Sequence, residues 1–188
     1  MRIIWMTLRT TFSVAIVCCI IYNIAVWAVA QAAAPDKANG SLIENAEGQV
    51  VGSSLIGQSF TDPGYFHGRV SSIDYDANGS GTPNYAPSNP ELLTRAEQSI
   101  ANWKSQNPEV PVSELPIDLI TNSGSGLDPH ISPASAEAQV PRVSAATGIA
   151  ADKLEQMIGE HTQGRSLGLF GEPAVNVLEL NLAVQAAR

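Results

Sequence analysis

Cysteine is almost missing from this sequence, and where it occurs it cannot crosslink a folded domain. The only two cysteines, Cys18 and Cys19, are adjacent and lie inside a long apolar run near the N-terminus. Neighbouring residues of a helix point in different directions, so these two are not expected to pair with each other. The rest of the chain therefore holds neither a disulfide framework nor thiolate ligands for zinc. Its roughly 150 residues are enough for a core that is stable without disulfides.

Basic residues are also scarce. The chain has 10 Lys and Arg against 18 Asp and Glu, and two of the basic residues, Arg2 and Arg9, precede the apolar run. All acidic residues follow that run, so the remainder of the chain carries a formal net charge of −10. Such a balance argues against nucleic acid as a partner and against docking on anionic lipid.

No charged residue occurs from Thr10 to Pro35. Residues 12–34 are almost wholly apolar, and as a helix they would cover about 35 Å, enough for a hydrocarbon core of about 30 Å. They predict one transmembrane helix. Because Arg2 and Arg9 precede it, the positive-inside rule favours a cytoplasmic N-terminus of residues 1–11 and an extracytoplasmic remainder.

A cleaved signal peptide is the alternative interpretation of this run. Ala28-Val29-Ala30 has the small-x-small form of a cleavage site. The apolar run is longer than the usual 7–15-residue core of a signal peptide, which favours a retained anchor.

The remaining chain is predicted to be a linker of residues 35–48 followed by one domain of residues 49–188. The fold class is a mixed α/β (α+β) extracytoplasmic domain with one N-terminal transmembrane helix. Helix signals are clearest after Asn89, a good N-cap followed by Pro90, and at residues 149–161. The first helix is expected to bury Leu92, Leu93, Ala96, Ile100 and Trp103, and the second Leu154, Met157 and Ile158.

Further elements follow from turn and capping residues. A short strand with a turn is expected in residues 49–60, a helix from Pro133 to Val140 with Ser132 as its cap, and a stop at Gly148. Residues 175–184 form the last apolar segment, either strand or helix. Residues 116–121 are predicted to be a buried strand.

That predicted strand opens the densest segment of the chain, Ile117 to Pro133. Its turn and helix start supply a candidate structural or docking motif, made of Ser123, Gly124, Ser125, Gly126, Asp128, Pro129 and His130. The glycines and Asp-Pro specify a backbone shape, and shaped loops on a rigid scaffold often carry function.

Catalytic interpretations of these residues have less support than a structural or docking role. Asp128, His130 and His161 could serve a membrane-anchored metallohydrolase, but they lack the recognisable spacing of a zinc site. The Ser/Gly stretch is not the G-x-S-x-G of an α/β-hydrolase. Residues 159–166 approximate a P-loop with arginine in place of lysine, which makes Gln163, Gly164, Arg165 and Ser166 weak ATP-related candidates. They follow a helix rather than a strand, so a helix end at Gly164 is favoured. No catalytic residues and no metal site are predicted.

Several motifs resemble the KdpC family, the C subunits of bacterial potassium-transporting Kdp ATPases. They are Tyr65-Phe66-His67-Gly68-Arg69, Ala86-Pro87-Ser88-Asn89-Pro90, residues 116–133, Gln139-Val140-Pro141-Arg142-Val143, and residues 161–162 through Gly171-Glu172-Pro173 to Asn176-Val177-Leu178-Glu179-Leu180-Asn181. They occur in the family's order and cover nearly the whole predicted domain.

The resemblance implies a non-catalytic subunit of an ATP-driven potassium importer in the bacterial inner membrane. Its partners would be a channel-like potassium-binding subunit (KdpA), a P-type ATPase subunit (KdpB), a very small membrane subunit (KdpF) and membrane lipid. The family is described as aiding assembly and as a catalytic chaperone that raises the ATPase subunit's affinity for ATP. No cofactor would be bound tightly, since ATP and potassium are handled by the complex. An extracytoplasmic domain does not meet ATP, so an indirect effect is expected.

Overall fold

The computed structural model describes residues 1–45 and 47–188; Ala46, within the predicted linker of residues 35–48, lies outside the described residues. The chain divides into two compact units, Met1–Ile43 and Glu44–Arg188. Helices and short strands are mixed, and one long apolar helix stands at the N-terminus, as the fold class predicts.

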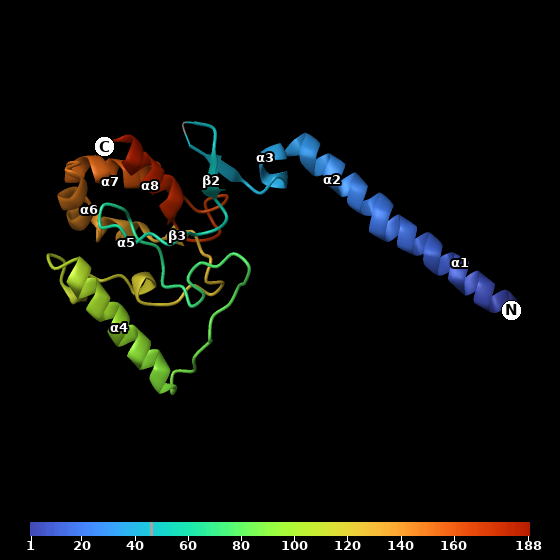
Figure 1. Ribbon diagram of the computed structural model, residues 1–188, viewed down its shortest axis with the longest axis horizontal. Helices are drawn as coiled ribbons and strands as arrows, with labels where there is room; N and C mark the ends of the chain where they lie inside the picture. Colours follow the sequence, from blue (N-terminus) through green and yellow to red (C-terminus); the bar gives the residue numbers. More distant parts are fainter. Residues whose placement is uncertain (46) are drawn as a thin grey trace. The chain divides into compact units, whose positions relative to one another are not determined.

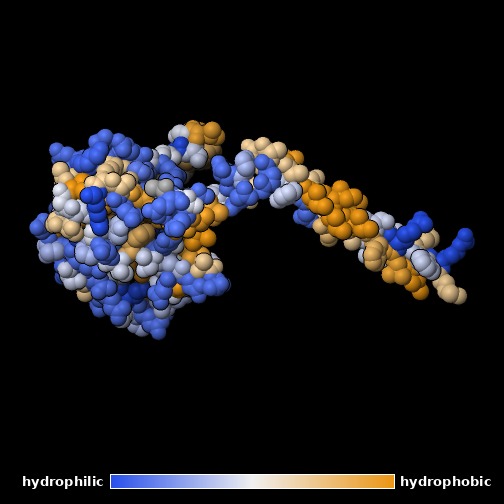
Figure 2. Space-filling model, turned by 45° about the horizontal axis from the view of Figure 1, so that its top comes forward, coloured by the Kyte–Doolittle hydropathy of each residue, from blue (hydrophilic) through white to orange (hydrophobic). Residues whose placement is uncertain are grey.

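The N-terminal unit is dominated by one continuous helix, Arg2–Ala33, which is long and apolar enough to cross a membrane. It consists of α1 (Arg2–Ile16), a π-helical turn η1 (Val17–Ile21) and α2 (Tyr22–Ala33). Hydrophobic side chains cover much of its surface (Figure 2), and none of them is buried. A single turn, α3 (Pro35–Ala38), follows, and strand β1 (Leu42–Glu44) runs across the boundary between the units.

The second unit contains short elements joined by long irregular segments (Figure 1). In chain order they are β2 (Val50–Ser53), α4 (Pro90–Gln106), the 3-10 turns η2 (Val112–Glu114) and η3 (Ile117–Leu119), β3 (His130–Ile131), α5 (Pro133–Glu137), α6 (Val140–Thr147), α7 (Ala151–Glu160), β4 (Thr162–Gln163), β5 (Ala174–Asn176) and α8 (Val177–Ala186). β5 is the central strand of a three-stranded antiparallel sheet of order β3-β5-β4. The last apolar segment is thus both strand and helix.

Asn176 makes this direct passage from strand to helix possible. It pairs with His130 in the sheet, and its side-chain oxygen accepts the backbone N–H groups of Leu178 and Glu179 at 3.1 and 3.2 Å. Two backbone donors that the first turn of a helix leaves free are thereby satisfied. Its amide nitrogen donates to the carbonyl of Ser54 at 2.9 Å, which ties the N-terminal part of the unit to the junction.

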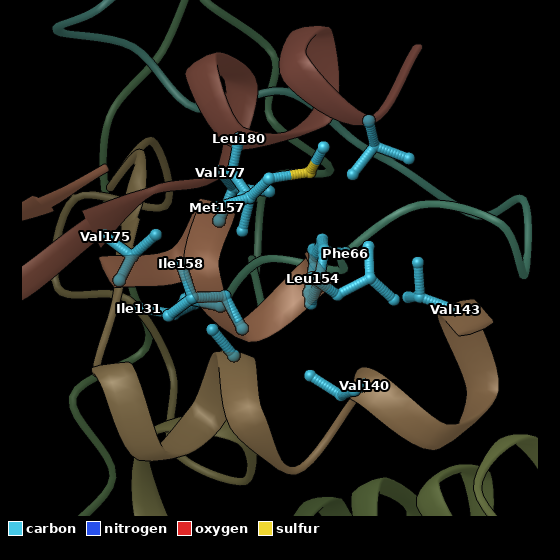
Figure 3. Packing of buried hydrophobic residues seen from close by; sticks show 12 residues of the cluster. Phe66, Ile131, Val140, Val143, Leu154, Met157, Ile158, Val175, Val177 and Leu180 are labelled. Carbon is cyan, nitrogen blue, oxygen red and sulfur yellow. The ribbon is translucent and has the colours of Figure 1, made fainter. Parts of the chain in front are cut away.

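The hydrophobic core lies between the sheet and the helices α5 to α8. Leu154, Met157 and Ile158 on α7 point into it, as predicted from their spacing. Figure 3 shows these side chains converging with residues from the strands and from α6 and α8. The buried cluster comprises Phe66, Ile131, Ala136, Val140, Val143, Leu154, Met157, Ile158, Val175, Val177, Leu180 and Val184.

Helix α4 begins as predicted, with the Asn89 side chain accepting the N–H of Glu91 at 2.9 Å and Pro90 in the first turn. Trp103 is its buried residue. The prediction for Leu93 is wrong, because 64% of its surface is exposed. α4 lies at the opposite side of the unit from α7 and α8 (Figure 1). Only its C-terminal part packs deeply, so the apolar face predicted for its first turn stays near solvent.

The expected helix from Pro133 to Val140 is two helices. Ser132 caps the first as predicted, accepting the N–H of Ser135 at 3.1 Å. α5 ends at Glu137, and Pro141 stands in the first turn of α6, where its missing N–H costs nothing. Gly148 ends α6 in the left-handed conformation, with φ +77°.

Two other predictions are wrong. Residues 116–121 contain the 3-10 turn η3 (Ile117–Leu119) instead of a buried strand, and Ile117 is 71% exposed. Side-chain contacts hold this turn in place: the Asp118 carboxylate accepts the Ser132 N–H at 2.8 Å and the Ser135 hydroxyl at 2.6 Å. The helix of residues 149–161 ends at Glu160, because Thr162 and Gln163 pair with β5, so Gly164 is not its end.

Amide side chains hold an irregular segment, residues 63–67, against the core. The Asn181 side chain bonds both backbone groups of Phe66, at 2.8 and 2.9 Å, and that of Gln139 bonds both backbone groups of His67, at 2.8 and 3.1 Å. Each amide thus satisfies one backbone N–H and one backbone carbonyl, as a neighbouring strand would do in a sheet. Phe66 can be fully buried because its backbone is satisfied in this way.

Arg142 completes the same network from α6. Its guanidinium donates to the carbonyls of Pro63 and Tyr65 at 2.6 and 2.9 Å and to the side-chain oxygens of Gln139 and Asn107 at 2.6 and 3.0 Å. Burial lowers the pKa of Arg142 to about 10, so it remains a cation at neutral pH.

Candidate functional site

The segment Ser123–His130 has a shape fixed from within by one buried hydroxyl. Ser123 is fully buried, and its Oγ accepts the N–H groups of Gly126 at 3.0 Å and Asp128 at 3.2 Å. Its own N–H donates to the Val70 carbonyl at 2.8 Å. A serine at this place therefore closes the turn rather than acting as a nucleophile.

Neighbouring segments hold the outer carbonyls of the loop. Leu127 accepts the N–H of Gly57 at 2.8 Å, Ser125 accepts that of Gly81 at 2.8 Å, and Gly126 accepts the Ser71 hydroxyl at 2.7 Å. Three segments that are distant in sequence thus define one loop conformation. The long irregular region around residues 71–81 therefore packs against this loop.

The two glycines of the motif differ in what surrounds them. Gly126 has φ +73°, and a Cβ there would stand 2.6 Å from Ile73 Cγ1 and 3.1 Å from the Gly81 carbonyl oxygen. A Cβ on Gly124 would meet nothing within 4 Å, and Gly124 and Ser125 are exposed. Gly126 is therefore required by the fold, whereas Gly124 is an open part of the loop surface.

Asp128 connects the loop to Arg69, a residue that the sequence reasoning did not single out. Its Oδ2 accepts Arg69 Nη1 at 3.1 Å, and its Oδ1 accepts the His130 N–H at 3.0 Å and lies 3.6 Å from His130 Nδ1. Burial pushes the pKa of Asp128 upward, but these contacts with His130 and Arg69 outweigh it and lower the pKa below its ordinary value. Burial, with the nearby Asp128 carboxylate, raises the pKa of Tyr75 to about 12, which keeps its hydroxyl as a donor to the Arg69 carbonyl at 2.6 Å.

An open groove of about 500 Å³ runs beside these residues. Its lining includes the polar or charged residues Arg69, Asp118, Asp128, His130 and Glu172. Pro116, Ile117, Pro173 and Ala174 supply apolar surface. Mixed polar and apolar lining on an open groove suits contact with another protein surface better than enclosure of a small molecule.

The three residues of the metallohydrolase alternative are not brought together. His130 stands on β3 and His161 directly precedes β4, with β5 between these strands, so about two strand spacings, roughly 10 Å, separate them. His161 Nδ1 bonds the Met157 carbonyl at 2.8 Å. Over residues 1–45 and 47–188, no group of three or more His, Cys, Asp or Glu side chains could hold a metal ion.

Gln163 is the last residue of β4, and Gly164, Arg165 and Ser166 begin the hairpin-like excursion between β4 and β5. Gln163 pairs with Ala174, the Arg165 guanidinium bonds both oxygens of Glu172 at 2.9 and 2.7 Å, and the Ser166 N–H donates to the Phe170 carbonyl at 2.8 Å. A phosphate-binding loop instead directs free backbone N–H groups at its ligand from a helix start.

The tip of this excursion, Leu167–Phe170, is apolar and exposed. Leu167, Leu169 and Phe170 are 88%, 74% and 65% exposed. Leu167 adopts φ +55°, a conformation that is costly for a residue with a side chain and that often accompanies function. This tip was not among the sites predicted from the sequence, although three large apolar residues within four positions are a readable signal.

Comparisons with known proteins cover both units. The family model for KdpC, the K+-transporting ATPase c chain, matches residues 4–186. A protein named Potassium-transporting ATPase KdpC subunit, from Bacillus cereus (strain B4264), is 58% identical over 178 residues, which cover 95% of this chain and 92% of that protein. Proteins with the same name from Bacillus anthracis (strain CDC 684 / NRRL 3495) and Bacillus thuringiensis subsp. konkukian (strain 97-27) have the same identity and coverage.

Proposed function

The chain belongs to the KdpC family of potassium-transporting ATPase subunits, and from this membership we propose that it is a non-catalytic accessory subunit of an ATP-driven potassium importer. The observation that carries the proposal is the 58% identity over 95% of the chain. The proposed partners are the channel-like subunit KdpA, the P-type ATPase subunit KdpB and the small membrane subunit KdpF. ATP and potassium are handled by those partners, and no cofactor is bound tightly here.

The proposed topology places the N-terminus in the cytoplasm and the folded unit outside the inner membrane. Support comes from Arg2 and Arg9 before the apolar helix, because the positive-inside rule counts basic residues near the ends of the helix. In this arrangement the helix both anchors the protein in lipid and provides one contact surface for the membrane parts of the partners.

Docking of the folded unit is assigned to two surfaces. One is the Ser123–His130 loop, whose shape is fixed before any partner binds, together with the adjacent groove. The other is the apolar tip Leu167–Phe170, since exposed apolar clusters on a soluble unit commonly mark contact sites. Pre-organised surfaces lose little conformational entropy on binding, which favours stable assembly.

A subunit on this side of the membrane affects ATP affinity indirectly. If it binds one conformation of the pump more tightly than the other, it shifts their populations, and the apparent affinity for ATP rises with the population of the competent state. This route accounts for a catalytic chaperone that does not contact the nucleotide.

Two variants test assembly separately from folding. Gly124→Val adds bulk to the open loop surface, where a Cβ meets no atom within 4 Å, so the variant is expected to fold and yet co-purify poorly with the channel-like and ATPase subunits. Gly159→Val is the matched control, because its position on α7 is equally open and lies outside the docking surfaces. The full complex would be purified by a tag on the ATPase subunit, and growth in low potassium would be scored in parallel. Failure of the wild-type chain to co-purify would refute the proposed function, while equal co-purification of both variants would refute only this docking surface.

A further inference from the structure

A single amide side chain lies at the middle of the apolar N-terminal helix. Asn23 is the central residue of the apolar run 12–34, and the other clearly polar residues of that run, Ser13 and Gln31, lie near its ends. In a helix that crosses a membrane, Asn23 stands close to the midplane of the hydrocarbon core, where a polar side chain is costly and usually marks a functional contact. The proposed function treats the helix as an anchor and a contact surface without using this side chain.

The amide nitrogen of Asn23 is occupied by the backbone of its own helix. Nδ2 donates to the carbonyl oxygen of Cys19 at 2.9 Å and to that of Cys18 at 3.2 Å. Both carbonyls belong to the π-helical turn η1 (Val17–Ile21), a departure from the regular α-helix that is frequent at functional sites. The amide carries two N–H groups, one for each carbonyl, so it has no further donor to offer.

The amide oxygen, in contrast, has no partner. Among the residues that the structure describes, no donor reaches Oδ1 of Asn23, and the side chain is exposed on the helix surface. Such an oxygen would be hydrated in water, but the hydrocarbon core supplies neither water nor a donor of its own. Because the bonds to Cys18 and Cys19 hold the amide in one orientation, its oxygen is presented as an acceptor in a fixed position.

This free acceptor selects the helix that covers it. A second copy of the chain in a parallel pair would bring Asn23 against Asn23 beside a two-fold axis, and neither amide has an N–H left to donate. The partner is therefore a different helix, one that carries a donor at the depth of Asn23, such as a hydroxyl, an amide, an indole or a basic group. The proposed importer supplies such helices, since its channel-like and ATPase subunits share the same membrane.

We propose that Asn23 is the residue through which the N-terminal helix hydrogen-bonds a membrane helix of another importer subunit. Asn23 Oδ1 accepts from a donor side chain of that helix, while Nδ2 keeps its bonds to the π-helical turn η1. One such bond fixes both the rotation and the depth of the helix, which apolar packing alone leaves variable. This site rests on the proposed function, to which it adds the chemistry of the contact inside the membrane.

Competition between two forms of the full chain measures the contribution of this bond. Wild-type chain and one variant would be co-expressed in equal amounts, in excess over the other importer subunits, and the complex would be purified by a tag on the ATPase subunit. Mass spectrometry gives the ratio of the two forms in the complex, which is divided by their ratio in the whole membrane fraction to correct for insertion and degradation. Asn23→Leu keeps the size but removes both polar groups. It should enter the complex roughly 3- to 20-fold less than wild type, as measured interhelical hydrogen bonds imply.

Two further variants assign the effect to the oxygen. Asn23→Ser keeps an acceptor, because a serine hydroxyl can donate to the carbonyl four residues earlier, that of Cys19, and still accept a bond. It should recover most of the incorporation. Gln31→Leu is the matched control, since it removes an amide near the end of the run, and it should be incorporated like wild type.

Equal incorporation of Asn23→Leu and wild type would overturn the proposal. Equal losses for Asn23→Leu and Asn23→Ser would also overturn it, since the amide would then serve only its own turn, as would equal losses for Asn23→Leu and Gln31→Leu. Self-association of the wild-type chain in membranes without the other subunits, abolished in Asn23→Leu, would overturn it in favour of a second copy. Absence of the wild-type chain from the complex would instead refute the proposed function itself, and this contact with it, so the two failures are distinguishable.

Discussion

Replacing Asn181 by leucine tests whether amide side chains, rather than strand pairing, hold the buried segment around Phe66. Asn181 is 2% exposed, and its amide bonds both backbone groups of Phe66, 115 residues away in sequence. Leucine has nearly the same size and shape but can neither donate nor accept. Asn181→Leu therefore leaves one buried N–H and one buried carbonyl without partners.

The expected loss follows from those two groups. Each buried polar group without a partner costs about 1–3 kcal/mol, which gives about 2–6 kcal/mol for the pair. A gain of about 1 kcal/mol from the added apolar surface offsets part of it. We expect a net loss of about 1–5 kcal/mol, a large share of the 5–15 kcal/mol typical of a domain.

The measurement is a urea titration of the full chain in detergent, in which unfolding is monitored by the fluorescence emission of Trp103. The Trp5→Phe/Trp27→Phe background removes the two tryptophans of the N-terminal helix, so that only Trp103 emits. Gln185→Leu is the matched control, because it lies one turn further along α8 and is exposed. Its free energy of unfolding should change by less than about 0.5 kcal/mol. If Asn181→Leu were no more destabilising than Gln185→Leu, side-chain amides would not be what holds the segment.

Three further outcomes are expected from thermal unfolding of the full chain. Gly126→Ala should cost about 1–3 kcal/mol, since its Cβ would stand 2.6 Å from Ile73 Cγ1, whereas Gly124→Ala should stay within about 0.5 kcal/mol; equal effects would contradict the loop geometry. Gly148→Ala should cost about 1 kcal/mol at its φ of +77°, and an unchanged Tm would contradict the left-handed cap. Burial, aided by Arg142, lowers the pKa of His67 below its ordinary 6.5. The folded state therefore disfavours its protonation, stability should fall as the pH drops below 6.5, and His67→Asn should flatten that fall.

Helix caps, helix ends and buried helix faces could be predicted from the sequence, because they depend on residues that are close together in the chain. Asn89 and Ser132 cap their helices, Gly148 ends one, and the spacing of Leu154, Met157 and Ile158 places one face of α7 in the core. Each of these outcomes depends on residues within two or three turns of one another. The apolar N-terminal helix was readable for the same reason.

The features that could not be predicted depend on side-chain contacts between residues that are distant in the sequence. The 3-10 turn at Ile117–Leu119 depends on Asp118 reaching Ser132 and Ser135, 14 and 17 residues away. Arg142 contacts Pro63 across 79 residues of sequence, and no periodic pattern encodes such a partner. In the candidate loop, the sequence marked both glycines equally, and only the neighbouring Ile73 distinguishes Gly126 from Gly124.

The junction of β5 and α8 has a consequence for how the chain is made. The central strand and the helix that carries Asn181 lie in residues 174–186, so the sheet and the support of Phe66 are completed only by the C-terminal end. At synthesis rates of about 5–20 residues per second, the central strand is synthesised on the order of 10 s after the first residues of the unit. On the proposed topology, this delay keeps the segment unfolded while it crosses the membrane, and folding is completed only after residues 174–186 have emerged.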